Sequence, residues 1–206
     1  MAKMKLYYSP SSPYARKVRI LAIETKLDKK IEMVNAALTP VAPNADVDKH
    51  NPIGKIPALS VKGMDLFDSP VICEYLDTHH KGRKFFPRKG RERWVALRQQ
   101  AMADGLLDAA LLARYEGALR PEDKRWSDWS KGQMKKVDGV LDALEAESKA
   151  LKGKLSIGTI SIVCALGYLD FRFATLDWRG KRPKLAKWFS TISKMPSVKA
   201  TVPPPA

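Results

Sequence analysis

The stretch that decides the fold is NPIGKIPAL at residues 51–59, in which a proline opens a short apolar run. Proline has no N–H to donate to a neighbouring strand, so Pro57 belongs at the start of a strand or on a sheet edge. A cis bond between Ile56 and Pro57 would leave the backbone N–H and C=O of Ile56 facing a cleft. This stretch therefore predicts a strand whose entry offers backbone hydrogen bonds to a ligand.

A second stretch, DSP at residues 68–70, has the signature of a helix start. Serine favours the cap and proline the first helical position, so Ser69 and Pro70 should open a helix. The first N–H groups of a helix have no intrahelical partner, and the helix dipole is positive there, so this start could bind an anion. A strand with free backbone groups beside such a helix suits a peptide-like ligand that carries a carboxylate.

The remaining pattern divides the chain near residue 80 into a mixed part and a helical part. In residues 1–80 we expect a small mixed sheet with helices on its faces, with strands at 6–8, 31–35, 57–61 and 64–67 and helices at 13–25 and 70–78. After a linker at 81–90, residues 91–206 should form an all-helical domain with helices near 91–117, 122–150, 156–176 and 183–195. The fold class is therefore α/β plus all-α, and the proline-rich residues 202–206 should lie extended.

The composition, with 45% hydrophobic and 29% charged residues, is that of an ordinary globular protein. No window approaches the roughly 18–20 apolar residues of a membrane span, so we expect no membrane partner. Cys73 and Cys164 lie far apart in apolar helical patterns, which predicts two buried thiols and a reducing, cytoplasmic compartment. Neither the cysteines nor the three histidines have metal-ligand spacing, so no metal is expected.

Positive charge is concentrated in the second part of the chain. The net charge is +15, and residues 81–206 hold 26 of the 37 Lys and Arg but only 13 of the 22 Asp and Glu. The densest stretch, 81–93, could attract an anionic substrate or contact nucleic acid, although a solvated linker and helix face explains it more simply. Because no nucleic-acid-binding module is visible, we expect no nucleic-acid partner.

The two stretches described first, together with SPSSPY at residues 9–14, resemble the glutathione transferase family. Nearer the C-terminus, LSIGTI at 155–160 and ALGYLD at 165–170 resemble the core helix of the family's second domain, with Ser156 as its cap. The resemblance implies a thioredoxin-like domain that binds glutathione, followed by a helical domain that contributes the electrophile site. It also implies a symmetric homodimer, in which Asp104 could reach across the interface.

Ser12 stands where cysteine stands in the family's Cys-Pro-Phe members. The resemblance implies that its hydroxyl donates a hydrogen bond to the glutathione sulfur, assisted by the helix dipole. Lowering a thiol pKa from about 8.5 by two units takes about 2.7 kcal/mol. A serine cannot form a mixed disulfide, which favours thiolate activation over thiol transfer. Helix capping alone also explains Ser12. Ser11 is the main alternative for the catalytic role, and the weaker candidates are Ser9, Tyr7 and Tyr8.

The resemblance assigns the other glutathione contacts as well. Ile56, ahead of Pro57, would pair its backbone with the cysteinyl moiety, and Ser69 would hold the γ-glutamyl carboxylate. Asp68 would face the ammonium group or brace its loop, and Lys55 would reach the glycyl carboxylate. A turn aspartate and a solvated lysine are the simpler interpretations of these two residues. His50 is a further candidate for the glycyl end, or a surface residue.

The electrophile would bind one face of the helix at residues 102–115, on which Leu107, Leu111 and Arg114 lie together, although most such stripes are core. We therefore expect a cytosolic detoxification enzyme that activates the glutathione thiol and transfers it to a small electrophile, or uses the thiolate in a related isomerase or peroxidase step. The alternative is a non-catalytic glutathione-transferase-like module that binds a partner protein or nucleic acid. The intact ligand-binding stretches favour the enzyme, and the basic second half favours the module.

Overall fold

The chain forms two compact units. The computed structural model describes residues 4–153 and 155–205. The first unit runs to Arg93 and takes in the last segment, from Pro196 onward, whereas the second unit spans Trp94–Met195.

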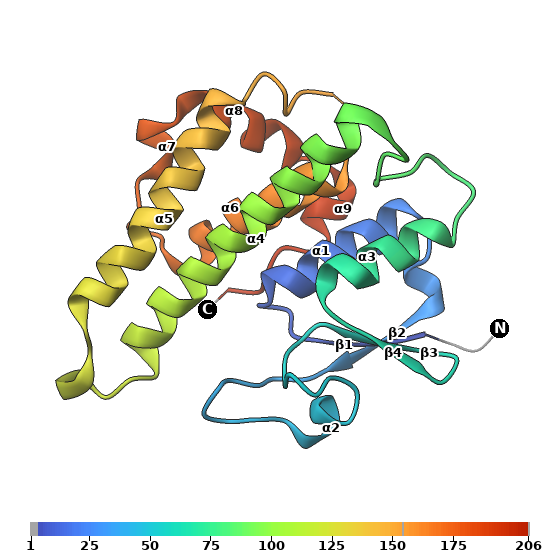
Figure 1. The fold of residues 1–206 in the computed structure, drawn as a ribbon, viewed down its shortest axis with the longest axis horizontal. Coiled ribbons are helices and arrows are strands. Elements are labelled where there is room, and N and C mark those ends of the chain that lie inside the picture. The colour runs from blue at the N-terminus through green and yellow to red at the C-terminus, as the bar shows by residue number, and fades with distance from the viewer. Residues whose placement is uncertain (1–3, 154, 206) are drawn as a thin grey trace. The chain divides into compact units, whose positions relative to one another are not determined.

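The first unit is built on a four-stranded sheet with the strand order β2-β1-β3-β4. The strands are β1 (Met4–Tyr8), β2 (Ile31–Asn35), β3 (Ala58–Val61) and β4 (Met64–Leu66). β1 is parallel to β2 and antiparallel to β3, and β4 is antiparallel to β3. One face carries α1 (Pro13–Glu24) and α3 (Ser69–Thr78), and the short α2 (Ala45–Asp48) lies on the other (Figure 1). The predicted thioredoxin-like arrangement is confirmed.

Strand alternation gives this sheet two small cores. The register partners Leu6 and Leu59 are fully buried. The next pair, Tyr7 and Ala58, belongs to a separate apolar cluster with Val47 of α2. Because successive side chains of a strand point to opposite faces, the Leu6 pair faces the side with α1 and α3, and the Tyr7 pair faces α2.

The last segment of the chain returns to the first unit. A short helix, α9 (Pro196–Lys199), contacts α1. The guanidinium of Arg16, a residue that is 4% exposed, donates hydrogen bonds to the Val198 carbonyl at 3.1 Å and to Thr201 Oγ1 at 3.4 Å. Residues 202–205 are not helical, as their proline content predicts, and residue 206 lies outside the described part of the chain.

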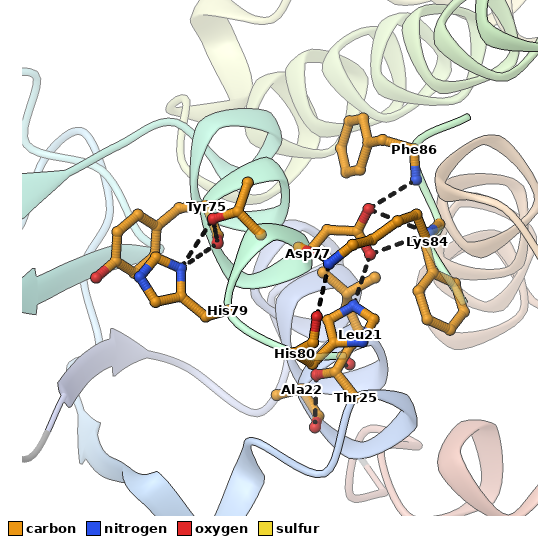
Figure 2. Close-up of polar contacts among 11 residues, drawn as sticks. Leu21, Ala22, Thr25, Tyr75, Asp77, His79, His80, Lys84 and Phe86 are labelled. Carbon is orange, nitrogen blue, oxygen red and sulfur yellow. Dashed lines mark hydrogen bonds and ion pairs between the residues drawn. The ribbon is translucent and has the colours of Figure 1, made fainter. Parts of the chain in front are cut away.

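The basic segment after α3 is tied to the end of that helix (Figure 2). Asp77 is 3% exposed, and its carboxylate accepts hydrogen bonds from the backbone amides of Phe85 and Phe86. His80 Nε2 lies 2.9 Å from the same carboxylate. Lys84 Nζ donates to the carbonyls of Asp77 and His80. Lys84, one of the cations of this basic segment, therefore stabilises the end of α3.

The described residues of the second unit form helices and the turns between them. These helices are α4 (Gly90–Ala118, whose first turn precedes the unit boundary), α5 (Ser127–Ala146), α6 (Ile157–Arg172), α7 (Trp178–Lys181) and α8 (Pro183–Ile192). α6 is apolar around most of its circumference and largely buried, as expected of a central helix. Its cap is the predicted Ser156, with Thr159 Oγ1 accepting a hydrogen bond from the Ser156 amide at 2.9 Å. The predicted all-helical second part is thus confirmed.

One predicted helix begins later than expected. The helix predicted from residue 122 starts only at Ser127, after a 3₁₀ turn at Glu122–Lys124. Trp126 has extended backbone, and its amide donates to Glu116 Oε1 at 2.7 Å. This contact to α4 interrupts the helical pattern that the local sequence suggests.

Candidate functional site

Three loops meet at one end of the sheet in the first unit. The loop at residues 9–12 follows β1, Pro57 precedes β3, and the 67–68 turn follows β4. Because β3 is antiparallel to both neighbours, its start lies beside the ends of β1 and β4. The topology therefore brings together the main residues predicted to contact glutathione in this unit, which are Ser11, Ser12, Ile56, Pro57, Asp68 and Ser69. Lys55, the other main candidate, is exposed in the turn before Ile56.

The entry to β3 has the predicted geometry. The Ile56–Pro57 peptide bond is cis. The preceding turn is held by Asn51, which is 2% exposed. The Asn51 amide group donates to the Lys55 carbonyl at 2.8 Å, and its oxygen accepts from the Ile53 amide at 3.0 Å. Local sequence patterns gave Asn51 no role; its position at the head of an otherwise exposed turn was the available signal.

The start of α3 differs by one residue from the expectation. Asp68, not Ser69, is the N-cap, because its carboxylate accepts a hydrogen bond from the Ser69 amide. Ser69 is fully buried, and its Oγ has no hydrogen-bond partner in the part of the chain that the structure describes. Leaving a buried hydroxyl unsatisfied costs roughly 1–3 kcal/mol. A ligand oxygen at this helix start would satisfy it.

The start of α1 presents Ser12. Its Oγ accepts a hydrogen bond from the Ala15 amide at 3.2 Å, so Ser12 is the N-cap of this helix. The rival Ser11 is differently placed, because its hydroxyl lies 3.0 Å from the hydroxyl of Ser9. Both serines are only partly buried. The structure thus keeps both within the loop at 9–12 but gives them different partners.

A hydrogen-bonded chain links Tyr7, His50 and Asp65 in the same unit. The Tyr7 hydroxyl lies 2.8 Å from His50 Nε2, and His50 Nδ1 lies 2.9 Å from Asp65 Oδ1. The Tyr7 and His50 rings are stacked at 4.5 Å. Both ring nitrogens of His50 therefore have protein partners. The chain joins β1 and β4 to the turn that leads to Pro57, a connection that local sequence patterns did not indicate.

The residues predicted for the electrophile lie on α4 in the second unit. Leu107 is 1% exposed, whereas Leu111 and Arg114 are partly buried. Leu107 therefore packs in the interior, and the other two reach the surface in part. Their role toward an electrophile stays a prediction.

The thiols and carboxylates that the structure describes do not gather into a metal centre. Within residues 4–153 and 155–205, no group of three or more His, Cys, Asp and Glu side chains is arranged to hold a metal ion. Cys73 and Cys164 are both buried thiols. Among the described helices, none combines the length and apolar character needed to cross a bilayer.

Comparisons with known proteins agree with this geometry. Residues 11–79 match the family model described as glutathione S-transferase, N-terminal domain, and residues 127–190 match the model for the C-terminal domain. A protein of Escherichia coli (strain K12), described as the uncharacterized GST-like protein YibF, is 34% identical over 98% of this chain and 100% of its own length.

Solved structures give the same result. A glutathione transferase family member from Pseudomonas fluorescens Pf-5, crystallised with bound glutathione, superimposes with a TM-score of 0.97 at 46% identity, over 98% of this chain and 100% of that chain. A crystal structure from the same organism with bound S-(propanoic acid)-glutathione has a TM-score of 0.92 at 45% identity, with the same coverage of both chains.

Proposed function

Because the chain belongs to the glutathione transferase family, we propose that it binds glutathione in the first unit and transfers the glutathionyl group, through its sulfur, to a small electrophile. The observation that carries this proposal is the buried Ser69 hydroxyl, which has no partner among the described residues at the start of α3. A γ-glutamyl carboxylate at this point would accept the Ser69 hydrogen bond and face the positive end of the helix dipole. Glutathione bound in a relative of 46% identity, and S-(propanoic acid)-glutathione bound in a structure of 45% identity, support the same ligand here.

The other glutathione contacts follow from the loops around Ser69. Ile56, held before the cis Pro57, would pair its backbone N–H and C=O with the cysteinyl residue. Lys55 is exposed and long enough to reach the glycyl carboxylate. Asp68 already caps α3, so its second oxygen would be the atom that faces the glutathione ammonium.

Ser12 would activate the thiol. Its hydroxyl donates to the sulfur and stabilises the thiolate, aided by the N-terminal dipole of α1. The thiolate then forms a bond to an electrophilic carbon, and the displaced electron pair leaves with a departing group such as chloride or moves onto an activated double bond that later takes a proton. Leu107, Leu111 and Arg114 of α4 stay our candidates for contact with the electrophile.

A matched pair of variants tests glutathione binding. By calorimetry we expect Ser69→Ala to weaken glutathione affinity by about 1–3 kcal/mol, as for loss of a hydrogen bond to a charged group. Ser193 is the control, because its Oγ is also buried without a partner in the described residues but lies in the second unit. Ser193→Ala should leave the affinity unchanged. No binding heat with the unmodified protein would refute the proposal.

Turnover separates an enzyme from a glutathione-binding module. Conjugation of glutathione to a panel of aryl halides and activated alkenes should exceed the uncatalysed rate, and this excess should fall in Ser12→Ala. A protein that binds glutathione but accelerates none of these reactions would be the non-catalytic module.

We also propose that the protein is a cytoplasmic homodimer that acts in detoxification. Twofold homodimers are the commonest assembly of soluble proteins, and the two buried thiols suit a reducing compartment. Light scattering should give twice the chain mass of 23.0 kDa. A monomer at micromolar concentration would remove the support for Asp104 acting across subunits.

A further inference from the structure

His50 is held against one face of the sheet by partners from two strands. Tyr7 of β1 is the register partner of Ala58 in β3. Asp65 of β4 is the partner of Ser60, two positions further along β3. These four side chains therefore point to the same face of the sheet, which is the face that carries α2. His50 follows α2 and bridges the two strands, with Nε2 2.8 Å from the Tyr7 hydroxyl and Nδ1 2.9 Å from Asp65 Oδ1.

These partners leave no ring nitrogen of His50 for a ligand. A carboxylate only accepts hydrogen bonds, so Nδ1 carries a proton and donates it to Asp65. In the neutral ring, Nε2 then accepts the proton of the Tyr7 hydroxyl. Tyr7 is 9% exposed, and its ring stacks on the imidazole, so this hydrogen bond is shielded from water. His50 can therefore act on the glycyl end of a ligand only through the backbone that follows it.

That backbone forms the turn that carries Lys55. The amides of His50 and of the next residue, Asn51, both donate to the Val47 carbonyl, at 2.9 and 2.8 Å. The Asn51 side chain donates to the Lys55 carbonyl at 2.8 Å, and the Asn51 carbonyl accepts the Gly54 amide at 2.9 Å. The backbone of Lys55 is thus fixed relative to Asn51, which is bonded directly to the anchored His50.

Lys55 depends on this turn more than its neighbour Ile56 does. Ile56 leads through the cis Pro57 straight into β3, which pairs with both β1 and β4. Lys55 is exposed, and it forms no ion pair within residues 4–153 and 155–205. Its ammonium group is therefore available to a ligand anion, and the turn determines where that group lies.

We propose that Tyr7, His50 and Asp65, together the His50 network, position Lys55 and set the preference of the site for a ligand with a charged glycyl carboxylate. The network fixes the start of the turn to the sheet before any ligand arrives. Conformational freedom that is already lost in the free protein does not oppose binding. This inference rests on the proposed function, and it adds the residues that determine selectivity at the glycyl end.

The test compares glutathione with glutathione amide, in which a carboxamide replaces the glycyl carboxylate. Calorimetry on the full chain should show that glutathione binds about tenfold or more tightly, as expected for a charge-assisted hydrogen bond. Lys55→Ala should remove this preference. Tyr7→Phe, His50→Phe and Asp65→Ala should each reduce it by about threefold to tenfold, while the affinity for the amide changes little. His50→Phe keeps a ring to stack on Tyr7, so its effect isolates the two hydrogen bonds.

Further variants separate positioning from general damage. Asp65→Asn keeps an oxygen that accepts the Nδ1 proton, so it should keep most of the preference that Asp65→Ala loses. The double variant His50→Phe/Asp65→Ala should lose no more than His50→Phe, because both residues act through one link. Asp46→Ala is the matched control, since Asp46 is a carboxylate of α2 that pairs with Lys49, and it should keep the full preference.

Equal binding of the two ligands to the unmodified protein would overturn the inference while glutathione binding stands. A full preference in all three single variants of the His50 network would overturn it as well. So would an equal loss of affinity for both ligands, because that result would assign these residues a structural role alone. Failure of glutathione itself to bind would instead refute the proposed function. Thermal unfolding of each variant confirms that the protein titrated is folded.

Discussion

The hydroxyl of Ser12 can hold two roles at once. Its oxygen accepts the Ala15 amide as a helix cap, and this uses a lone pair but not the hydroxyl proton. That proton remains to be donated to a thiolate. Ser11 shares a hydrogen bond with Ser9 and does not cap the helix. Capping and thiol activation are therefore compatible at Ser12, and one substitution should reveal both.

We expect Ser12→Ala to lower the free energy of unfolding by about 0.5–2 kcal/mol through the lost cap. The thiol pKa of bound glutathione should rise toward its free value of about 8.5, because the donor to the thiolate is gone. Thiolate absorbance titrated against pH on the folded variant measures this shift. Ser11→Ala should leave that pKa in place, and the reverse result would assign the role to Ser11.

A second residue-level prediction concerns His50, which connects Tyr7 to Asp65 through both ring nitrogens. Because these contacts hold the turn before Pro57, His50→Ala should raise the glutathione dissociation constant by about fivefold to thirtyfold, the equivalent of one or two hydrogen bonds. The rate of conjugation at saturating glutathione should change little. His79→Ala is the control, since His79 bonds to its own helix and to Thr78. Equal effects of the two variants would show that His50 has no special link to the site.

Helices and strands were largely predictable because each carries its own local signal. Proline at Pro13 and Pro183, together with strand alternation around β1 and β3, placed most elements to within a few residues. The two misplaced helix starts have different causes. The start of α3 moves by one residue because the adjacent Asp68 caps it through its carboxylate, and Glu116 of α4 delays the start of α5 by binding the Trp126 amide. The short α9 also went unpredicted, because its position depends on α1.

The residues of the candidate site also differ in how far the sequence predicts them. Ile56, Pro57 and Ser69 could be found because each lies in a short motif with a backbone reason for its residue type. The hydrogen bond between Tyr7 and His50 could not be predicted from the sequence, since the two residues are 43 positions apart and neither stands out on its own.

The contact between α4 and α6 leads to a prediction about helix packing. A Cβ at Gly158 would lie 2.7 Å from the Ala96 carbonyl oxygen and from Gln99. Gly158→Ala should therefore destabilise the protein by about 1–3 kcal/mol through overpacking. At Gly139 of α5, an added Cβ would meet no atom of a neighbouring described residue within 4 Å, so Gly139→Ala should be neutral or stabilise by up to about 1 kcal/mol. Urea unfolding of both variants makes the comparison, and equal stability losses would contradict it.

The stability of the whole molecule should depend on Tyr168 at alkaline pH. Below about pH 10, the phenol is protonated in both the folded and the unfolded chain. As the pH rises further, the unfolded chain loses the proton first, because burial raises the pKa of the folded state to about 12. Stability that is present below the unfolded pKa is thus lost progressively, by about 2.7 kcal/mol for two units.

Tyr168→Phe removes this titration, so its unfolding free energy should fall less steeply between about pH 10 and pH 12 than that of the parent protein. Tyr75→Phe is a control for tyrosine ionisation in general, because Tyr75 lies on α3 of the other unit. Parallel pH profiles for the parent and Tyr168→Phe would show that the buried phenol does not titrate as expected.

The return of the last segment to α1 has a consequence for biosynthesis. The ribosome makes the sheet and α1 before the second unit, but Arg16 meets Val198 and Thr201 only after the whole second unit has been synthesised. The second unit, Trp94–Met195, lies between these partners in the chain. The first unit is therefore begun before the second unit and completed after it, and a stop codon in place of Pro196 would leave the first unit without the segment that contacts Arg16.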